Sequence, residues 1–257
     1  MTRQHAVRVA WAAFVCALLA GAVVGGASPA SAFSNMGGDT LPANEGPHAG
    51  IAPDGRVWYV PMQRKEIALT FDDGPYPFYT PLLLHQLAME EQTPATFFLV
   101  GRTVQEYPQL VERILSAGGE IANHTFNHYA LTGLSDEEIE DQIADCGALL
   151  SQYTGSQPTL FRPPHGRYDA RVVEIARRLG YRTILWSDAP DDAPKDNSDV
   201  PVPVIVERVL AHAKPGGIVL LHSGQYNTIE AIPQIVDTLQ AEGYTFVTVS
   251  QLLADQT

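Results

Sequence analysis

The chain is poor in cysteine: its 257 residues contain only Cys16 and Cys146. Cys16 lies in a segment that we expect to be removed, so the remaining protein has no internal disulfide and needs an ordinary hydrophobic core. Cys146 shares a helical apolar spacing with Ile139, Ile143 and Leu149. That spacing predicts a buried structural thiol rather than a nucleophile.

Basic residues are also scarce, with 16 Lys and Arg against 29 Asp and Glu and a formal net charge of −13. Binding to phosphate backbones needs positive charge, so this balance argues against nucleic acid as a partner. It also weighs against close binding to anionic wall polymers, although salt screens much of that repulsion. With 45% hydrophobic and 18% charged residues, the composition excludes a disordered or fibrous chain.

A long apolar run occurs only at the N-terminus. Arg3 and Arg8 precede the uncharged residues 9–26, and Ala30-Ser31-Ala32 then supplies the small-residue pattern that signal peptidase cleaves. An uncleaved membrane anchor is the alternative, because about 18 apolar residues is the lower limit for a span. We expect residues 1–32 to be a signal peptide and the mature chain to be secreted or wall-associated, without stable membrane insertion.

Residues 33–56 are rich in Gly, Pro, Asn and Ser and have no periodicity, which predicts an extended arm or linker. We expect residues 57–257 to form one domain. Strands are predicted at 67–71, 95–100, 120–122, 159–161, 183–186, 217–221 and 245–249, and helices at 81–91, 104–117, 136–153, 170–179, 202–213 and 229–242. This alternation predicts a parallel sheet covered by helices, either a nearly closed barrel or an open doubly wound sheet.

Reactive residues follow the predicted strand ends rather than the helices. They are Asp72 and Asp73, His124 and His128, Arg162, Trp186 and His222. Both architectures place their ligands beyond the carboxyl ends of the strands, so the pattern predicts a functional site at that edge.

Two of these groups suggest a metal site with a separate proton acceptor. Adjacent carboxylates such as Asp72 and Asp73 point in opposite directions if the strand continues, so one can bind a cation while the other handles a proton. His124 and His128 share a face if the segment is helical. Two histidines and one carboxylate are a common ligand set for Zn²⁺ that leaves positions open for water and substrate.

Two further residues suit proton transfer and electrostatic support. His222 ends an apolar strand, and the unperturbed histidine pKa of about 6.5 suits a general acid. Arg162 is a permanent cation beside Pro163 and Pro164, and it can hold a carboxylate charged and correctly aimed.

The ordered motifs resemble the polysaccharide deacetylases of carbohydrate esterase family four. The motifs are Thr70-Phe71-Asp72-Asp73-Gly74, His124-Thr125-Phe126-Asn127-His128, Arg162-Pro163-Pro164-His165-Gly166 and Leu220-Leu221-His222. The resemblance covers roughly residues 66–253. It implies a distorted (β/α) barrel of about seven strands in a monomeric, secreted, metal-dependent hydrolase. Its activity would be N-deacetylation of an N-acetylglucosamine-containing polysaccharide, either chitin oligomers or peptidoglycan. The alternatives are an O-acetyl esterase acting on acetylated xylan and a catalytically inactive carbohydrate-binding relative.

The resemblance also assigns roles to single residues. It implies Asp72 as the base, Arg162 as the residue that steers it, His222 as the general acid, and Asp73, His124 and His128 as ligands of a divalent metal, most often zinc. The backbone N–H of His165 would help bind the oxyanion, and Trp186 and Leu220 would line the pocket for the acetyl methyl.

Two motifs depart from the family pattern. His165 stands where a tyrosine is common, and the fourth motif, in residues 188–193, fits more than one register. We favour Asp192 as the carboxylate that tunes His222, which leaves Ala193 where the family commonly has a tryptophan.

Overall fold

The computed structural model describes residues 50–187 and 200–254. The expected signal peptide, most of the expected arm and Asp192 therefore lie outside the described residues. The elements in chain order are β1 (Glu66–Asp72), α2 (Tyr79–Met89), β2 (Ala95–Leu99), α3 (Gly101–Glu106), α4 (Pro108–Ser116), β3 (Glu120–Asn123), η2 (Leu131–Gly133), α5 (Asp136–Thr154), β4 (Leu160–Phe161), η3 (Pro164–Gly166), α6 (Ala170–Arg178), β5 (Arg182–Thr183), α7 (Val202–His212), β6 (Gly217–His222), α8 (Tyr226–Ala241), β7 (Thr245–Phe246) and α9 (Val249–Ala254).

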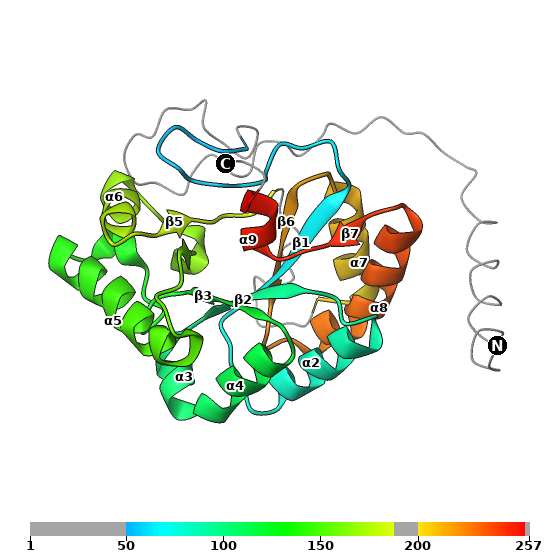
Figure 1. Ribbon diagram of the computed structural model, residues 1–257, viewed down its shortest axis with the longest axis horizontal. Helices are drawn as coiled ribbons and strands as arrows, with labels where there is room; N and C mark the ends of the chain where they lie inside the picture. The colour runs from blue at the N-terminus through cyan, green and yellow to red at the C-terminus, as the bar shows by residue number, and fades with distance from the viewer. Residues whose placement is uncertain (1–49, 188–199, 255–257) are drawn as a thin grey trace. The chain divides into compact units, whose positions relative to one another are not determined.

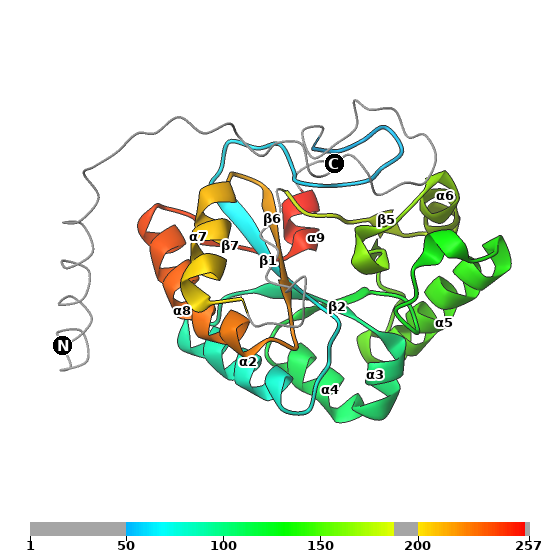
Figure 2. The same cartoon turned by 180° about the vertical axis from the view of Figure 1, so that it is seen from behind.

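A seven-stranded sheet forms the centre, in the order β5-β4-β3-β2-β1-β6, with β7 paired to the start of β1. The ladders between its strands are parallel. The sheet is curled, and helices α2 to α8 lie on its outer side (Figures 1 and 2). The predicted parallel sheet and the distorted barrel of about seven strands are confirmed.

Residues 57–60 fill the space between the two end strands of the sheet. Leu185 N–H donates to Val57 O at 2.7 Å beside β5, and Val60 N–H donates to Gly216 O at 2.9 Å beside β6. No ladder joins β5 directly to β6 within residues 50–187 and 200–254. This irregular segment therefore closes the curl that the strands leave open.

Alternation along β1 decides which side chains enter the barrel. Ile67, Leu69 and Phe71 belong to the cluster packed under the helices, whereas Ala68 belongs to the inner cluster with Phe98 and Ile218. Because side chains alternate along a strand, Thr70 and Asp72 also face inward. The inner cluster is completed by Val249, Leu252 and Leu253 of α9.

The helices and helix ends predicted from the sequence are confirmed in part. Ser135 and Glu138 form the predicted capping box at the start of α5, and Gly155 ends that helix in a left-handed conformation. The single helix predicted at 104–117 is wrong: Tyr107 leaves the helical region at φ −131° and Pro108 opens a second helix. Helix α9 was not predicted. Cys146 is fully buried, as expected.

The described end of the expected arm, residues 50–56, packs against the domain. Arg56 is 1% exposed. Its Nε donates to Asp54, and its Nη1 donates to the Tyr168 hydroxyl at 3.2 Å. Across the two described stretches, no helix is both long and apolar enough to cross a membrane.

Candidate active site

Asp72 is the last residue of β1 and lies in a buried ion pair. It is 3% exposed, and Arg162 Nη1 donates to its Oδ1 at 2.6 Å. Burial lowers the pKa of Arg162, while the charge of Asp72 opposes that change. Guanidinium stays protonated in proteins, so this pair places one full positive charge beside the carboxylate.

Arg162 is held rigidly by groups on three other strands or their extensions. The guanidinium donates to Thr70 Oγ1 at 2.8 Å, Ile184 O at 3.3 Å and Leu185 O at 3.1 Å. Its carbon centre lies 4.0 Å from the centroid of Phe98. Sequence reasoning missed Thr70 as a partner, although its place two residues before Asp72 puts both side chains on the same face of β1.

Asp73 does not point away from Asp72, so the expectation of opposite directions is wrong. Asp73 has φ +76°, and the chain leaves strand geometry there. Both carboxylates consequently approach His124, whose Nε2 lies 3.7 Å from Asp72 Oδ2 and 3.5 Å from Asp73 Oδ1.

His124 and His128 meet across a loop rather than along a helix, so the helical basis of that prediction is also wrong. Thr125 and His128 adopt left-handed φ values of +67° and +60°, which brings the two imidazole rings to 4.9 Å between centroids. Asn123 Oδ1 accepts from Thr125 N–H, and Thr125 Oγ1 accepts from His128 N–H. These bonds fix the loop from within.

The tautomer of His124 follows from its partner. Its Nδ1 lies 2.8 Å from the carbonyl oxygen of Arg162. A carbonyl only accepts, so Nδ1 carries a proton, and Nε2, on the side of Asp73, is the nitrogen that can bind a metal ion.

Asp73, His124 and His128 fit a divalent cation. One ligand atom from each lies within 4.8 Å of the others. Asp73 Oδ1 is buried without a hydrogen-bond partner, and His128 Nε2 is 3.1 Å from it. Burial would raise the pKa of Asp73, but the two imidazoles outweigh it and hold the pKa well below its usual range. An ionised carboxylate and two imidazole nitrogens are the donors that Zn²⁺ and similar ions take.

His222 and Leu220 reach the same centre from β6. His222 stands opposite Asp72 in the β1–β6 register, and Leu220 stands opposite Thr70. The charge of His222 is one of those that lower the pKa of Asp73. Leu220 is 6% exposed and faces the barrel interior two residues before His222.

His165 lies beside His128, and Trp186 lies against the loop that carries His165. The ring of His165 is 4.6 Å from that of His128, and His165 has φ +59°. A Cβ on Gly166 would stand 2.5 Å from the Trp186 ring, so a side chain there would push the loop away. Partial burial lowers the pKa of His165, and the charges of His128 and Arg167 lower it further.

Sequence reasoning also missed Tyr76, which follows the Gly74-Pro75 turn. Burial raises the pKa of Tyr76 to about 12, the carboxylate of Asp73 adds to the rise and Arg102 opposes it. Its ring lies beside Gly224, just beyond His222. Asp192, expected to tune His222, lies outside the described residues.

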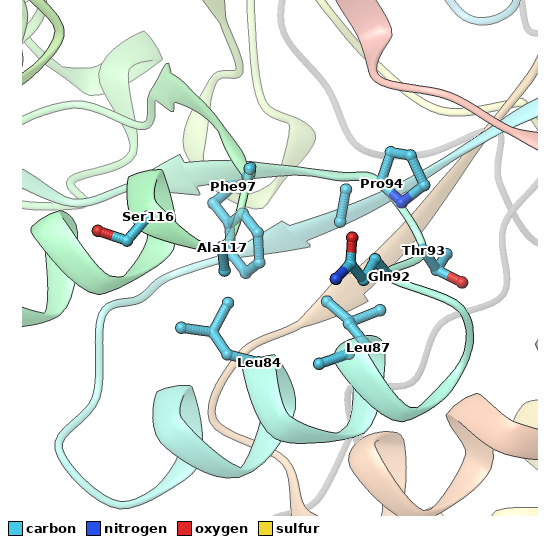
Figure 3. Close-up of a pocket in the computed structure, with 12 residues that line it drawn as sticks. Leu84, Leu87, Gln92, Thr93, Pro94, Phe97, Ser116 and Ala117 are labelled. Carbon is cyan, nitrogen blue, oxygen red and sulfur yellow. The ribbon is translucent and has the colours of Figure 1, made fainter.

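A cavity of about 400 Å³ lies away from this centre. Figure 3 shows it between Leu84 and Leu87 of α2, Phe97 of β2 and Ala117 after α4. It includes Ala95, the first residue of β2, so it lies near the amino-terminal edge of the sheet. The carboxyl-terminal edge, with its charged and imidazole groups, is therefore the candidate site.

Known proteins are similar to this chain in sequence and in fold. A family model described as polysaccharide deacetylase matches residues 59–184. The peptidoglycan-N-acetylglucosamine deacetylase of Bacillus cereus is 44% identical over 207 residues, which cover 79% of this chain and 95% of the relative. The peptidoglycan-N-acetylmuramic acid deacetylase PdaA of Bacillus subtilis is 34% identical over 195 residues, 76% of this chain and 73% of the relative. The crystal structure of a peptidoglycan N-acetylglucosamine deacetylase with 4-naphthalen-1-yl-N-hydroxybenzamide matches with a TM-score of 0.71 and 32% identity, over 77% of this chain and 92% of that chain.

Proposed function

Because the chain belongs to the polysaccharide deacetylase family and is therefore a hydrolase of carbon–nitrogen bonds, we propose that it removes N-acetyl groups from an N-acetylglucosamine-containing polysaccharide. The substrate would be peptidoglycan or chitin oligomers. One observation carries the proposal: the Asp72–Arg162 pair and the Asp73, His124 and His128 cluster share His124 as a neighbour of both carboxylates.

The two carboxylates have separate tasks in this proposal. Asp73, His124 and His128 would hold a divalent cation, for which we propose zinc, and that ion would supply Lewis-acid activation of the acyl oxygen and of water. Asp72 takes the proton of the attacking water as the base. Arg162 fixes the direction of the Asp72 carboxylate through its 2.6 Å bond, and its three other hydrogen bonds hold the guanidinium in place.

Departure of the amine needs an acid. Water adds its oxygen to the acetyl carbon, the carbon–nitrogen bond breaks, and the nitrogen must gain a proton to leave as an amine. His222 is proposed as that donor because it lies beside Asp72 at the end of β6. Acetate and a free amino sugar are the products.

The remaining rim residues would shape the acetyl pocket. Leu220 faces inward below His222, and Trp186 packs under the loop that carries His165. The backbone N–H of His165 would add a donor for the developing oxyanion. Asp192 would tune His222 from the segment outside the described residues. We also propose export of the enzyme after cleavage behind Ala32, so that it meets its polymer outside the cell.

An acetate-release screen tests the proposal. Purified mature protein loaded with zinc is incubated with peptidoglycan, chitooligosaccharides and acetylated xylan, and acetate is quantified. Release from either N-acetylated polymer, abolished by Asp72→Asn, is the expected result. Release from acetylated xylan alone would replace the amide activity by an ester activity. No release from any of the three would overturn the proposal.

A further inference from the structure

Two arginines stand on the rim that carries the candidate site. Arg102 is the second residue of α3, just after β2, and Arg167 follows η3 after β4. Both side chains are exposed. They come from the carboxyl ends of strands on either side of β3, the strand that leads to His124 and His128.

The backbone of each arginine adjoins a loop of the candidate site. Arg102 N–H donates at 2.8 Å to the carbonyl of Phe126, which stands between the two ligand histidines. The charge of its guanidinium lowers the pKa of Tyr76, which the carboxylate of Asp73 raises. The charge of Arg167 lowers the pKa of His165, whose ring centroid is 4.6 Å from that of His128. The two arginines thus leave the backbone on either side of β3, next to the loops that carry His128 and His165.

Neither guanidinium forms an ion pair with a described residue. Six other arginines do: Arg56, Arg64, Arg162, Arg171, Arg177 and Arg178. In a chain with 29 acidic against 16 basic residues, carboxylate partners are plentiful. Two exposed arginines that pair with none of those described, both beside the reacting centre, are placed to meet negative charge on a ligand.

The same rim exposes aromatic rings. Phe78 is 63% exposed and Tyr129 is 53% exposed. Tyr129 directly follows His128, and Phe78 lies in the loop that Asp73 opens. Exposed aromatic faces can cover the apolar faces of sugar rings, so the rim offers stacking and positive charge together.

We propose that Arg102 and Arg167 bind carboxylates of the glycan, so that the preferred substrate is an N-acetylated polymer carrying acidic groups, as peptidoglycan does, rather than a neutral one such as chitin. This inference rests on the proposed deacetylase function and selects among its substrates. Although the net charge of −13 disfavours anionic polymers at long range, local charge acts within the Debye length of about 8 Å at physiological salt.

The expected gain in affinity from each arginine follows from the exposure of its side chain. Ion pairs between exposed groups are weak, and their usual range corresponds to a roughly two- to fivefold change in affinity per arginine. The two contributions multiply if each arginine binds a different carboxylate.

The test compares one glycan in two charge states. Soluble chains of N-acetylglucosamine and N-acetylmuramic acid are used as such and after amidation of their carboxylates. Zinc-loaded mature protein is assayed for kcat/KM by acetate release, and its affinity for each glycan is measured by calorimetry. We expect wild type to bind and turn over the charged glycan several-fold better, mostly through KM, with the preference shrinking as salt rises.

Variants assign the effect to the two residues. Arg102→Gln and Arg167→Gln should each lose roughly two- to fivefold on the charged glycan and nothing on the amidated glycan or on a chitooligosaccharide. Arg113→Gln is the matched control, because Arg113 is exposed and unpaired among the described residues but lies in the last turn of α4, away from the rim. It should change neither substrate. Thermal unfolding checks that all three variants fold.

The outcomes separate the two proposals. Equal affinity of wild type for the charged and amidated glycans would overturn the carboxylate inference, even if acetate is released from both. Equal losses on both glycans in the arginine variants would also overturn it. An absence of acetate from every N-acetylated glycan would instead reject the deacetylase function, while the calorimetric comparison still decides whether carboxylates are recognised.

Discussion

The buried pair of Asp72 and Arg162 predicts a large stability effect when only one partner is removed. Arg162 is fully buried and makes four polar contacts, one of them to Asp72 at 2.6 Å. Arg162→Met keeps an unbranched, uncharged stem in place of the longer guanidinium side chain and leaves the Asp72 carboxylate buried without its cation. Breaking such a pair costs about 3–5 kcal/mol, and a domain of this size should then lose roughly 6–20 °C in Tm.

The double variant tests whether the cost arises from the unpaired charge. Asp72→Asn alone leaves the Arg162 charge buried, so it should also destabilise the fold. Arg162→Met combined with Asp72→Asn removes both charges and should be more stable than the sum of the single losses implies, with a coupling energy of at least about 2 kcal/mol. Urea unfolding at one fixed zinc concentration gives all four free energies. Activity should fall by at least roughly 10²-fold in all three variants.

A surface pair supplies the matched control. Arg177 and Glu174 lie 2.8 Å apart, with side chains 61% and 53% exposed. The equivalent cycle with Arg177→Met and Glu174→Gln should give a much smaller coupling, because water screens the pair. If the Asp72 and Arg162 losses simply add, the view that the two residues act as one buried ion pair is refuted.

Four further outcomes follow from the site and the chain ends. His124→Ala should lose both bound zinc and activity, measured by metal analysis and acetate release, whereas Asp72→Asn should keep zinc and lose at least roughly 10²-fold in rate. A metal-free but active wild type would contradict the ligand set. His222→Ala should lose roughly 10²–10⁴-fold on an amide but far less on an activated aryl acetate, whose phenolate leaves unaided; equal losses with zinc retained would exclude leaving-group protonation. Mass spectrometry of secreted protein should find Phe33 at the N-terminus, and full-length protein confined to membranes would contradict export. Cys146 should resist thiol reagents at pH 8 until the fold is denatured, because burial raises its pKa to about 12, and rapid labelling of native protein would contradict its burial.

The positions of the reactive residues were predictable because strand ends are visible in the sequence. Apolar β-branched and aromatic runs mark strands, and parallel strands align their carboxyl ends at one edge. Asp73, His124 and His128 could therefore be grouped before any coordinates were known. The route by which they meet was not predictable, because it depends on left-handed backbone at Asp73, Thr125 and His128. None of these is glycine, and although Asp and His enter the left-handed region more often than most residues, that preference is too weak to predict the turns.

Residues 50–56 show the opposite case, in which composition points to a linker but long-range contacts build structure. Arg56 is a single cation in a Gly- and Pro-rich stretch, and its partner Tyr168 lies 112 positions along the chain. Its carbon centre stacks at 5.1 Å over Trp58 and at 5.2 Å over Tyr168. Contacts between residues so far apart leave no periodic pattern in the sequence, so they cannot be predicted from a short segment of it.

That packing has a consequence for the site. Trp58 and Leu185 share a small core with Ala52, against which Tyr168 and Trp186 pack. Trp186 in turn supports Gly166 in the loop that carries His165. The irregular segment that closes the barrel between β5 and β6 thus also supports one wall of the candidate site. Trp58 of that segment stacks on the buried Arg56, which gives the preceding residues 50–56 a fixed position there.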